Sequence, residues 1–196
     1  MANVSLVENP KGALQRMSFR YSQRKFGRIV DPVRAAANHG GVLVAMGATE
    51  TVVEKSWNKL DLSLRWLAIQ ATAGAIGCSW CTDYGYFEGV NQGVDPQKVR
   101  DVFRWRDSGA YDERERAVLE YAEGVTSTPA HVSEDLVARL KELFSDAELV
   151  ELNGWVALEN LRSRFNAGAG LRSEGFSESC DLPAGYLAGP DRAGVI

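Results

Sequence analysis

The sequence is short of cysteine, histidine and proline. Its 196 residues include three cysteines, two histidines and six prolines. A zinc or iron–sulfur site needs about four ligands, usually in closely spaced pairs, so this supply of cysteine and histidine argues against both kinds of metal centre. Alternating apolar and polar runs flanked by hairpin turns are also nearly missing, which argues against a β-rich fold. We expect no metal and no cofactor.

An excess of basic residues and a long apolar run are missing as well. The net charge is −4 and the isoelectric point is near 5.3, whereas a protein that follows a nucleic-acid backbone usually carries a basic surface. No segment approaches the roughly 20 consecutive apolar residues of a membrane span, and the N-terminal residues lack the apolar core of a secretory signal. We therefore expect a cytoplasmic protein without nucleic-acid or membrane partners.

Helical spacing dominates the sequence. In "LDLSLRWLAIQATAGAIG", apolar residues recur every three or four positions, as on the buried face of a helix. These residues are Leu60, Leu64, Leu67, Ala68, Ala71 and Ala75. We predict that this helix stops at Gly77, and that the next one begins near Cys78 and runs to Gly89 or Gly93. The fold class that follows is all-α.

Later helices are marked by residues that cap helix N-termini. The predicted caps are Asp95 (followed by Pro96), Asp112, Ser133 and Ser145. Glu148 follows Ser145 by three residues and completes a capping box. The last of these helices, in "SDAELVELNGWVALENLRSRFNAGAG", has an apolar stripe that we expect in the core. The stripe consists of Leu149, Leu152, Val156 and Leu161.

The chain divides into three predicted segments within a single domain. Residues 1–55 form an N-terminal arm whose helices pack on the core, residues 56–172 form the core, and residues 173–196 form an irregular tail rich in Gly, Ser and Pro. Within the arm, "DPVRAAANHGGVLVAMG" predicts a helix and a turn at Gly40–Gly41.

Cys78 and Cys81 stand three positions apart at the predicted start of a helix. There the exposed N–H groups and the helix dipole stabilise a thiolate, which favours a redox-active pair. Metal ligation and two buried structural thiols are the alternatives. Aromatic residues on the same helix, Trp80 among them, would give the pair an apolar wall. The third cysteine, Cys180, is interpreted as an incidental surface thiol.

Several motifs in order resemble the carboxymuconolactone decarboxylase superfamily, in its alkylhydroperoxidase (AhpD-like) branch. They are "LDLSLRWLAIQATAGAIG", the CxxC pair, "GVDPQKV", "WRDSGAYDERERAVLEYAEGVT" and "FSDAELVELNGWVALENLRSRFNAGAG", which together cover about residues 60–170. The resemblance implies an AhpD-like helical domain that assembles as a homo-oligomer, a trimer or hexamer, and reduces hydroperoxides or another small-molecule substrate through the cysteine pair.

Site residues follow from the same resemblance. Cys81 matches the cysteine that attacks the peroxide, and Cys78 matches the resolving cysteine that closes a disulfide, which an external dithiol reductant then opens. The reverse assignment stays open, because Cys78 lies nearer the helix start. The family's proton relay uses a glutamate and a histidine, but the matching positions hold Trp66 and Gly85. A weak or atypical peroxidase or dithiol–disulfide oxidoreductase is therefore the leading hypothesis.

Substitutes for the relay are conceivable among nearby side chains. Tyr84 and Glu88 share a helix face with Cys81, and Gln70 lies one turn beyond the first relay position. Each also has an ordinary interpretation, Tyr84 as a packing aromatic and Glu88 as a solvated carboxylate. A polar run on the closing helix, Asn160, Arg164 and Asn166, is interpreted as structural hydrogen bonding.

An alternative hypothesis makes the chain a non-catalytic member of the same fold. The replaced relay would then leave an aromatic pocket, lined by Trp66, Trp80, Tyr84 and Gly85, that binds a small apolar ligand. Decarboxylation of a lactone is a weaker reading, because the CxxC pair belongs to the peroxidase branch.

Overall fold

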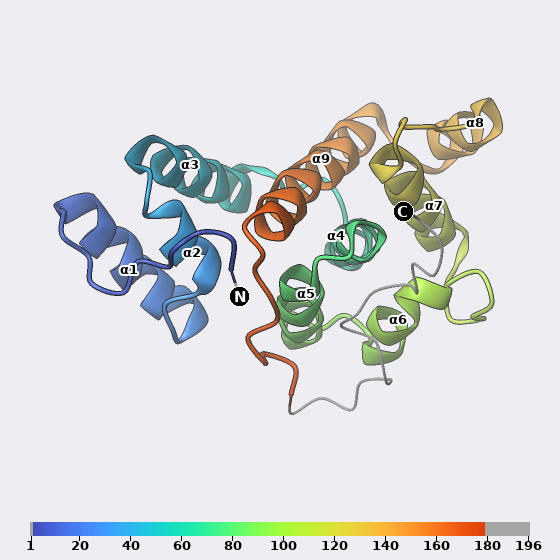
Figure 1. The fold of residues 1–196 in the computed structure, drawn as a ribbon. Coiled ribbons are helices and arrows are strands. Elements are labelled where there is room, and N and C mark those ends of the chain that lie inside the picture. The colour runs from blue at the N-terminus through green and yellow to red at the C-terminus, as the bar shows by residue number, and fades with distance from the viewer. Residues whose placement is uncertain (1, 179–196) are drawn as a thin grey trace. The chain divides into compact units, whose positions relative to one another are not determined.

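The computed structural model describes residues 2–178, which form helices and contain no strand within that range (Figure 1). The helices are α1 (Ala13–Phe26), α2 (Asp31–Ala36), α3 (Gly40–Ser56), α4 (Leu62–Ile76), α5 (Ser79–Asn91), α6 (Pro96–Asp101), the 3₁₀ helix η1 (Val102–Arg104), α7 (Glu113–Thr126), α8 (Glu134–Leu143) and α9 (Asp146–Gly168). The all-α prediction is confirmed. None of the helices in this part of the chain is both long and apolar enough to cross a membrane.

Contacts divide the chain into two compact units. Among the described residues, one contains 2–58 and 168–172, and the other contains 59–167 and 173–178. The division into an arm, a core and a tail stays a prediction. Cys180 and the predicted tail beyond Glu178 lie outside the described residues.

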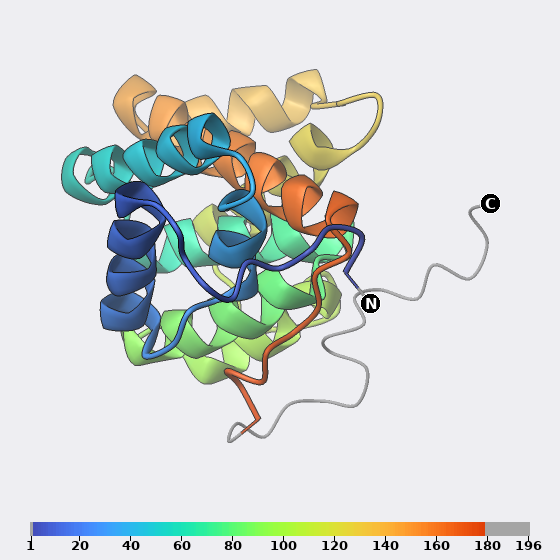
Figure 2. The same cartoon turned by 60° about the vertical axis from the view of Figure 1, so that its left-hand side comes forward.

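In the first unit, α1 packs against α2 and α3 (Figure 2). The predicted turn at Gly40–Gly41 is wrong, because these glycines are the first two residues of α3. The turn comes just before them, and His39 caps the helix by accepting a hydrogen bond from the Val42 N–H at 3.3 Å. A side-chain cap of this kind supplies a partner for an otherwise unpaired N–H, so the glycines lie inside the helix.

In the second unit, α4 packs against α5, α7 and η1. Every residue of α4 from Leu64 to Gly74 is buried except Arg65, which is half-buried. A helix that is apolar on nearly all sides belongs in a core, and α4 is therefore buried beyond the predicted face. It ends at Ile76, and Gly77 follows with a positive φ of 79°, as the sequence predicted.

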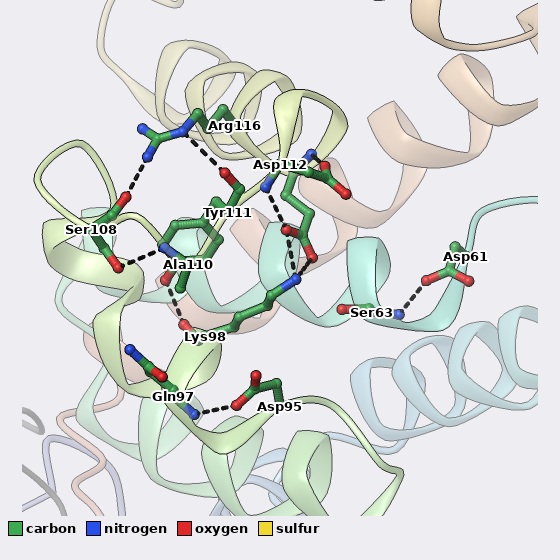
Figure 3. Close-up of polar contacts among 11 residues, drawn as sticks. Asp61, Ser63, Asp95, Gln97, Lys98, Ser108, Ala110, Tyr111, Asp112 and Arg116 are labelled. Atoms are coloured by element: carbon green, nitrogen blue, oxygen red, sulfur yellow. Dashed lines mark hydrogen bonds and ion pairs between the residues drawn. The ribbon is translucent and has the colours of Figure 1, made fainter.

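The predicted caps form as expected. Asp95 accepts from the Gln97 N–H at 2.8 Å, and Asp112 and Glu115 form a reciprocal capping box at the start of α7 (Figure 3). Ser133 caps α8, and Ser145 and Glu148 bond to each other at the start of α9. Local side-chain chemistry therefore fixes where these helices begin.

A buried ion pair ties α6 to α7. Lys98 Nζ lies 2.6 Å from the Glu115 carboxylate, whose side chain is only 6% exposed. The Tyr111 hydroxyl donates to the Lys98 carbonyl, and Arg116 donates to the carbonyls of Tyr111 and Ser108 (Figure 3). Burial, followed by the nearby carboxylates, raises the pKa of Tyr111 above its usual value. These contacts hold the loop between the two helices against α7.

The buried stripe of α9 differs from the predicted one. Leu152 and Val156 are buried as predicted, but Leu161 is 53% exposed. The stripe continues instead through polar residues, and Ser163 donates to the buried Glu159 carboxylate at 2.6 Å. Asn166 is the next residue on it. Polar side chains are therefore buried along the half of α9 that leads to the cysteines.

Candidate dithiol site

Cys78 and Cys81 open α5. Cys78 occupies the cap position, its Sγ accepts from the Cys81 N–H at 3.2 Å, and the two cysteines form a disulfide with their Cα atoms 5.3 Å apart. Both side chains are buried, with 3% and 5% of their surface exposed. The preceding Gly77 turns the chain out of α4, so the glycine that ends one helix places the pair at the positive end of the next.

Asn166 of α9 lies against both sulfurs. Its Nδ2 is 3.3 Å from Cys81 Sγ and 3.8 Å from Cys78 Sγ. The residue is 3% exposed, and its Oδ1 has no hydrogen-bond partner among residues 2–178. Sequence analysis placed Asn166 in a structural polar run and missed this contact. The spacing of Glu159, Ser163 and Asn166 along one face of α9 was the available signal.

Asp83 anchors residues 173–178, which we call the C-terminal strap. Its Oδ2 accepts from Ser173 Oγ and from the N–H groups of Glu174 and Phe176 at 2.8–3.1 Å. Its Oδ1 accepts from the N–H and the hydroxyl of Ser177 at 2.8 and 2.6 Å. The strap runs beside α5 in Figures 1 and 2. Asp83 therefore holds the strap through five hydrogen bonds.

The electrostatics of Asp83 match this anchoring. Burial alone would raise the pKa of its carboxyl, but the hydrogen bonds from Ser177, Ser173 and Phe176 outweigh burial and hold the pKa below its usual value. Asp83 is therefore ionised at neutral pH, and its charge is satisfied by the strap. Sequence analysis assigned no role to Asp83.

An aromatic cluster connects the strap to the first turns of α5. The Trp80 ring stacks on Tyr84 with ring centroids 5.4 Å apart, and Phe176 of the strap packs edge-on against both rings. Trp80 Nε1 also donates to the Glu174 carboxylate at 2.7 Å, and Phe87 lies near Phe176. The predicted apolar wall is therefore built partly by the strap.

The two positions that match the family's relay, Trp66 on α4 and Gly85 on α5, lie where α4 and α5 pack together, and in both places α5 has a glycine. A Cβ atom added at Gly85 would lie 3.1 Å from the Gln70 carboxamide, and one added at Gly89 would lie 3.6 Å from Trp66. Gln70 is fully buried, donates to the Thr82 carbonyl at 3.2 Å, and its Oε1 has no partner within the described part of the chain. The space beside Gly85 thus holds a neutral amide.

Two other predicted site residues, Trp66 and Glu88, form their hydrogen bonds with Gln92 and not with the sulfurs. Trp66 Nε1 donates to Gln92 at 3.1 Å, and Gln92 in turn donates to Glu88 at 2.6 Å. The structure thus brings Cys78 and Cys81 together and joins Trp80 to Tyr84, while Trp66 and Glu88 share a different partner. Across residues 2–178, no group of three or more His, Cys, Asp or Glu side chains is arranged to hold a metal ion.

The order of these elements matches a known family. A model of the carboxymuconolactone decarboxylase family matches residues 36–124. Residues 36–124 carry a carboxymuconolactone decarboxylase family domain. Over these residues the family predicted from the motifs is confirmed. Among curated proteins, the chain is similar to Uncharacterized protein YnjA of Escherichia coli (strain K12), with 26% identity over 183 residues that cover 93% of this chain and 95% of YnjA.

Solved structures confirm the AhpD-like fold. The apo crystal structure of the debrominase Bmp8 superposes with a TM-score of 0.79 at 20% identity, covering 90% of this chain and 95% of Bmp8. An alkylhydroperoxidase AhpD core protein, an uncharacterized peroxidase-related protein from Ralstonia eutropha JMP134, superposes with a TM-score of 0.78 at 20% identity, covering 89% and 94% of the two chains. At these identities the likeness concerns the fold.

Proposed function

We propose that this protein is a thiol-dependent oxidoreductase that reduces hydroperoxides with Cys81 and Cys78. The observation that carries the proposal is the pair itself, two sulfurs within bonding distance at a helix N-terminus. Each sulfur has an N–H donor: the Cys81 backbone N–H donates to Cys78 Sγ, and Asn166 Nδ2 donates to Cys81 Sγ. Such donors stabilise a thiolate, which is the reactive form of cysteine. The family match and the AhpD-like neighbours support the same chemistry.

The oxidising half of the cycle consumes one hydroperoxide. The Cys81 thiolate attacks the terminal peroxide oxygen, an S–O bond forms as the O–O bond breaks, and the leaving alkoxide takes a proton to become an alcohol. Cys81 is then a sulfenic acid. The Cys78 thiolate attacks the Cys81 sulfur and expels the oxygen, which leaves as water after protonation. The sum is dithiol plus ROOH giving disulfide, ROH and water.

The reducing half needs an external dithiol. One of its thiolates attacks the Cys78–Cys81 disulfide to form a mixed disulfide, and its second thiol completes the exchange. Two electrons and two protons pass from the donor to the pair, and the donor leaves as a disulfide. We expect the oxidising half to be slow compared with an enzyme that has a histidine relay, because Gly85 and Trp66 cannot take a proton from the attacking thiol.

A second candidate substrate is a halogenated aromatic compound. The aromatic cluster of Trp80, Tyr84 and Phe176 beside the pair favours it, because flat rings pack well on aromatic side chains. Bmp8 is a debrominase, and a cysteine-to-alanine variant of it was solved with 2,3,4-tribromopyrrole, at 20% identity to this chain. The balanced reaction would convert the dithiol and Ar–Br into the disulfide, Ar–H, bromide and a proton.

A direct test mixes fully reduced protein with cumene hydroperoxide and follows Cys78–Cys81 disulfide formation by peptide mass mapping. We expect stoichiometric closure in the wild-type chain, no turnover in Cys81→Ser, and a sulfenic acid that accumulates on Cys81 in Cys78→Ser. Cys180→Ser serves as the matched control for a cysteine outside the pair. If Cys81→Ser retains peroxide turnover, the assignment of Cys81 as the nucleophile is wrong.

The same protein, incubated with tribromopyrrole instead, decides between the two substrates. Two results together would replace the peroxidase proposal by the second candidate. They are bromide release that depends on Cys81, and oxidation of the pair by cumene hydroperoxide that is no faster than its oxidation of free cysteine. Ligand binding without loss of either thiol would favour the non-catalytic alternative.

A further inference from the structure

Only one end of the Asn166 carboxamide has a hydrogen-bond partner among residues 2–178. Its Nδ2 contacts the Cys81 sulfur at 3.3 Å, while its Oδ1 is buried and has no partner among residues 2–178. Buried polar atoms in folded proteins nearly always have a hydrogen-bond partner, so an exception calls for an explanation. Here the exception lies on the same amide that touches the reactive sulfur. A ligand that brings an O–H or N–H group to this place would remove it.

We propose that Asn166 is a catalytic residue of the dithiol site, whose N–H group stabilises negative charge on Cys81 Sγ and whose carbonyl oxygen binds the O–H of the hydroperoxide. The second half rests on the function proposed above, whereas the first half does not. The assignment adds a substrate-binding role to Asn166, which the proposed function uses only as a hydrogen-bond donor to the Cys81 sulfur.

The two ends of the amide suit consecutive moments of the reaction. In the reduced protein the Cys81 thiolate accepts the Nδ2–H, and a hydrogen bond to an ionised acceptor is stronger than one between neutral groups. The substrate then donates its O–H to Oδ1, which holds the peroxide beside the sulfur in the manner that positioned reactants require. When an external dithiol later opens the disulfide, the same N–H stabilises the sulfur that leaves as a thiolate.

A neutral amide performs this role in a way that a titrating side chain would not. The carboxamide keeps its donor and its acceptor across the whole working pH range. A carboxylate in the same place would raise the thiol pKa through repulsion. Asn166 therefore favours the thiolate and accepts uncharged substrates that carry a hydrogen-bond donor, a description that fits alkyl hydroperoxides.

Asn160 provides a matched control on the same helix. Its Nδ2 donates to Thr126 Oγ1 and to the Val156 carbonyl, each at 3.0 Å, and no hydrogen bond of this amide to either sulfur occurs among the described residues. Asn160→Ala removes the same chemical group from α9 without touching the pair. Asn166→Leu complements Asn166→Ala, because leucine keeps the number and branching of the side-chain heavy atoms and leaves no cavity.

The first experiment measures alkylation of Cys81 by iodoacetamide in the fully reduced chain at pH 7, resolved by peptide mass mapping. Loss of the N–H donor should raise the Cys81 thiol pKa by about one unit, which slows alkylation about tenfold in Asn166→Ala and Asn166→Leu. Asn160→Ala should alkylate within about twofold of the wild-type chain. Equilibration with glutathione at an alkaline pH, where the thiols are ionised, should show the reduced pair about tenfold less favoured in both Asn166 variants, or about 30 mV.

An unchanged alkylation rate and an unchanged glutathione equilibrium in both Asn166 variants would overturn the sulfur half of the proposal. The substrate half is read from the ratio of the cumene hydroperoxide rate to the alkylation rate, because iodoacetamide offers no O–H group. We expect this ratio to fall in Asn166→Leu, and a ratio equal to that of the wild-type chain would overturn it. If the wild-type chain shows no peroxide reaction, the proposed function and the substrate half fail together, and the alkylation result still decides the sulfur half.

Discussion

Replacing Asp83 by asparagine should release the C-terminal strap, residues 173–178. The carboxylate accepts three hydrogen bonds at Oδ2 and two at Oδ1. An asparagine has the same shape, but one of its two positions becomes an NH₂ group that points at donors. If the amide places its nitrogen at the Oδ1 position, the two hydrogen bonds from Ser177 are lost. The three bonds at the Oδ2 position then weaken, because their acceptor is no longer charged.

The cost follows from those losses. Hydrogen bonds to a charged group contribute roughly 1.5–3 kcal/mol each in mutational series. Two such losses give about 3–6 kcal/mol for Asp83→Asn. The loss of unfolding free energy does not grow to the value for all five bonds, because a strap that detaches forms hydrogen bonds with water instead. The free energy of docking the strap is therefore the ceiling on the loss.

The pH dependence has a defined sign. Because the folded-state pKa of Asp83 lies below its usual value, its contribution is fully present above the unfolded pKa of about 3.9 and is lost as the pH falls through the lower folded value. The difference in unfolding free energy between the wild-type chain and Asp83→Asn should thus be constant from pH 5 to 8. It should shrink below about pH 4.

Urea unfolding at pH 7, followed by tryptophan fluorescence, measures the loss, and limited trypsin digestion tests its location. In the variant we expect faster cleavage after Arg172, which immediately precedes the strap. Glu88→Gln is the matched control, because Glu88 lies on the same helix and its carboxylate accepts from Gln92 instead of from the strap. A loss below about 1 kcal/mol with unchanged cleavage after Arg172 would refute the reasoning.

Two further predictions concern the packing that supports the site. Gly74→Ala should lower the urea midpoint, because a Cβ atom there would overlap the Phe103 ring, and overpacking costs typically about 1–3 kcal/mol. The control Gly47→Ala, whose Cβ meets nothing within 4 Å, should raise the midpoint through helix propensity. Equal shifts of the midpoint in the two variants would contradict this prediction. Because the pKa of Tyr111 is raised, its contribution is complete below about pH 10 and is lost as the pH rises further, so unfolding scans of Tyr111→Phe should lack that part of the alkaline loss.

Features that depend on nearby residues could be predicted from the sequence. Asp95 and Ser133 cap their helices, and Gly77 ends α4, because each of these effects is decided within a few positions. The CxxC pair was found for the same reason, since both the spacing and the helix start are local. The turn misplaced at Gly40–Gly41 shows the limit of such signals, because the cap was a histidine, outside the usual set.

Contacts between distant segments could not be predicted. The donors to Asp83 lie 90 or more residues away, on the strap, and nothing in the local sequence distinguishes Asp83 from an exposed acidic residue. Asn166 was noted as polar, but its partner lies 85 residues away. A search for apolar periodicity also misses a buried polar residue such as Asn166. The buried stripe of α9 passes through Glu159 and Ser163 and leaves Leu161 exposed.

Two of the polar groups that the structure places around α5 are neutral amides, Gln70 beside Gly85 and Asn166 beside the sulfurs. An amide can stabilise a thiolate that already exists, but it cannot take the proton that the thiol must lose. Formation of the thiolate therefore falls to solvent and to the helix N-terminus at Cys78. A site of this composition separates two tasks that a histidine relay combines, since it holds the charge on the sulfur without generating it.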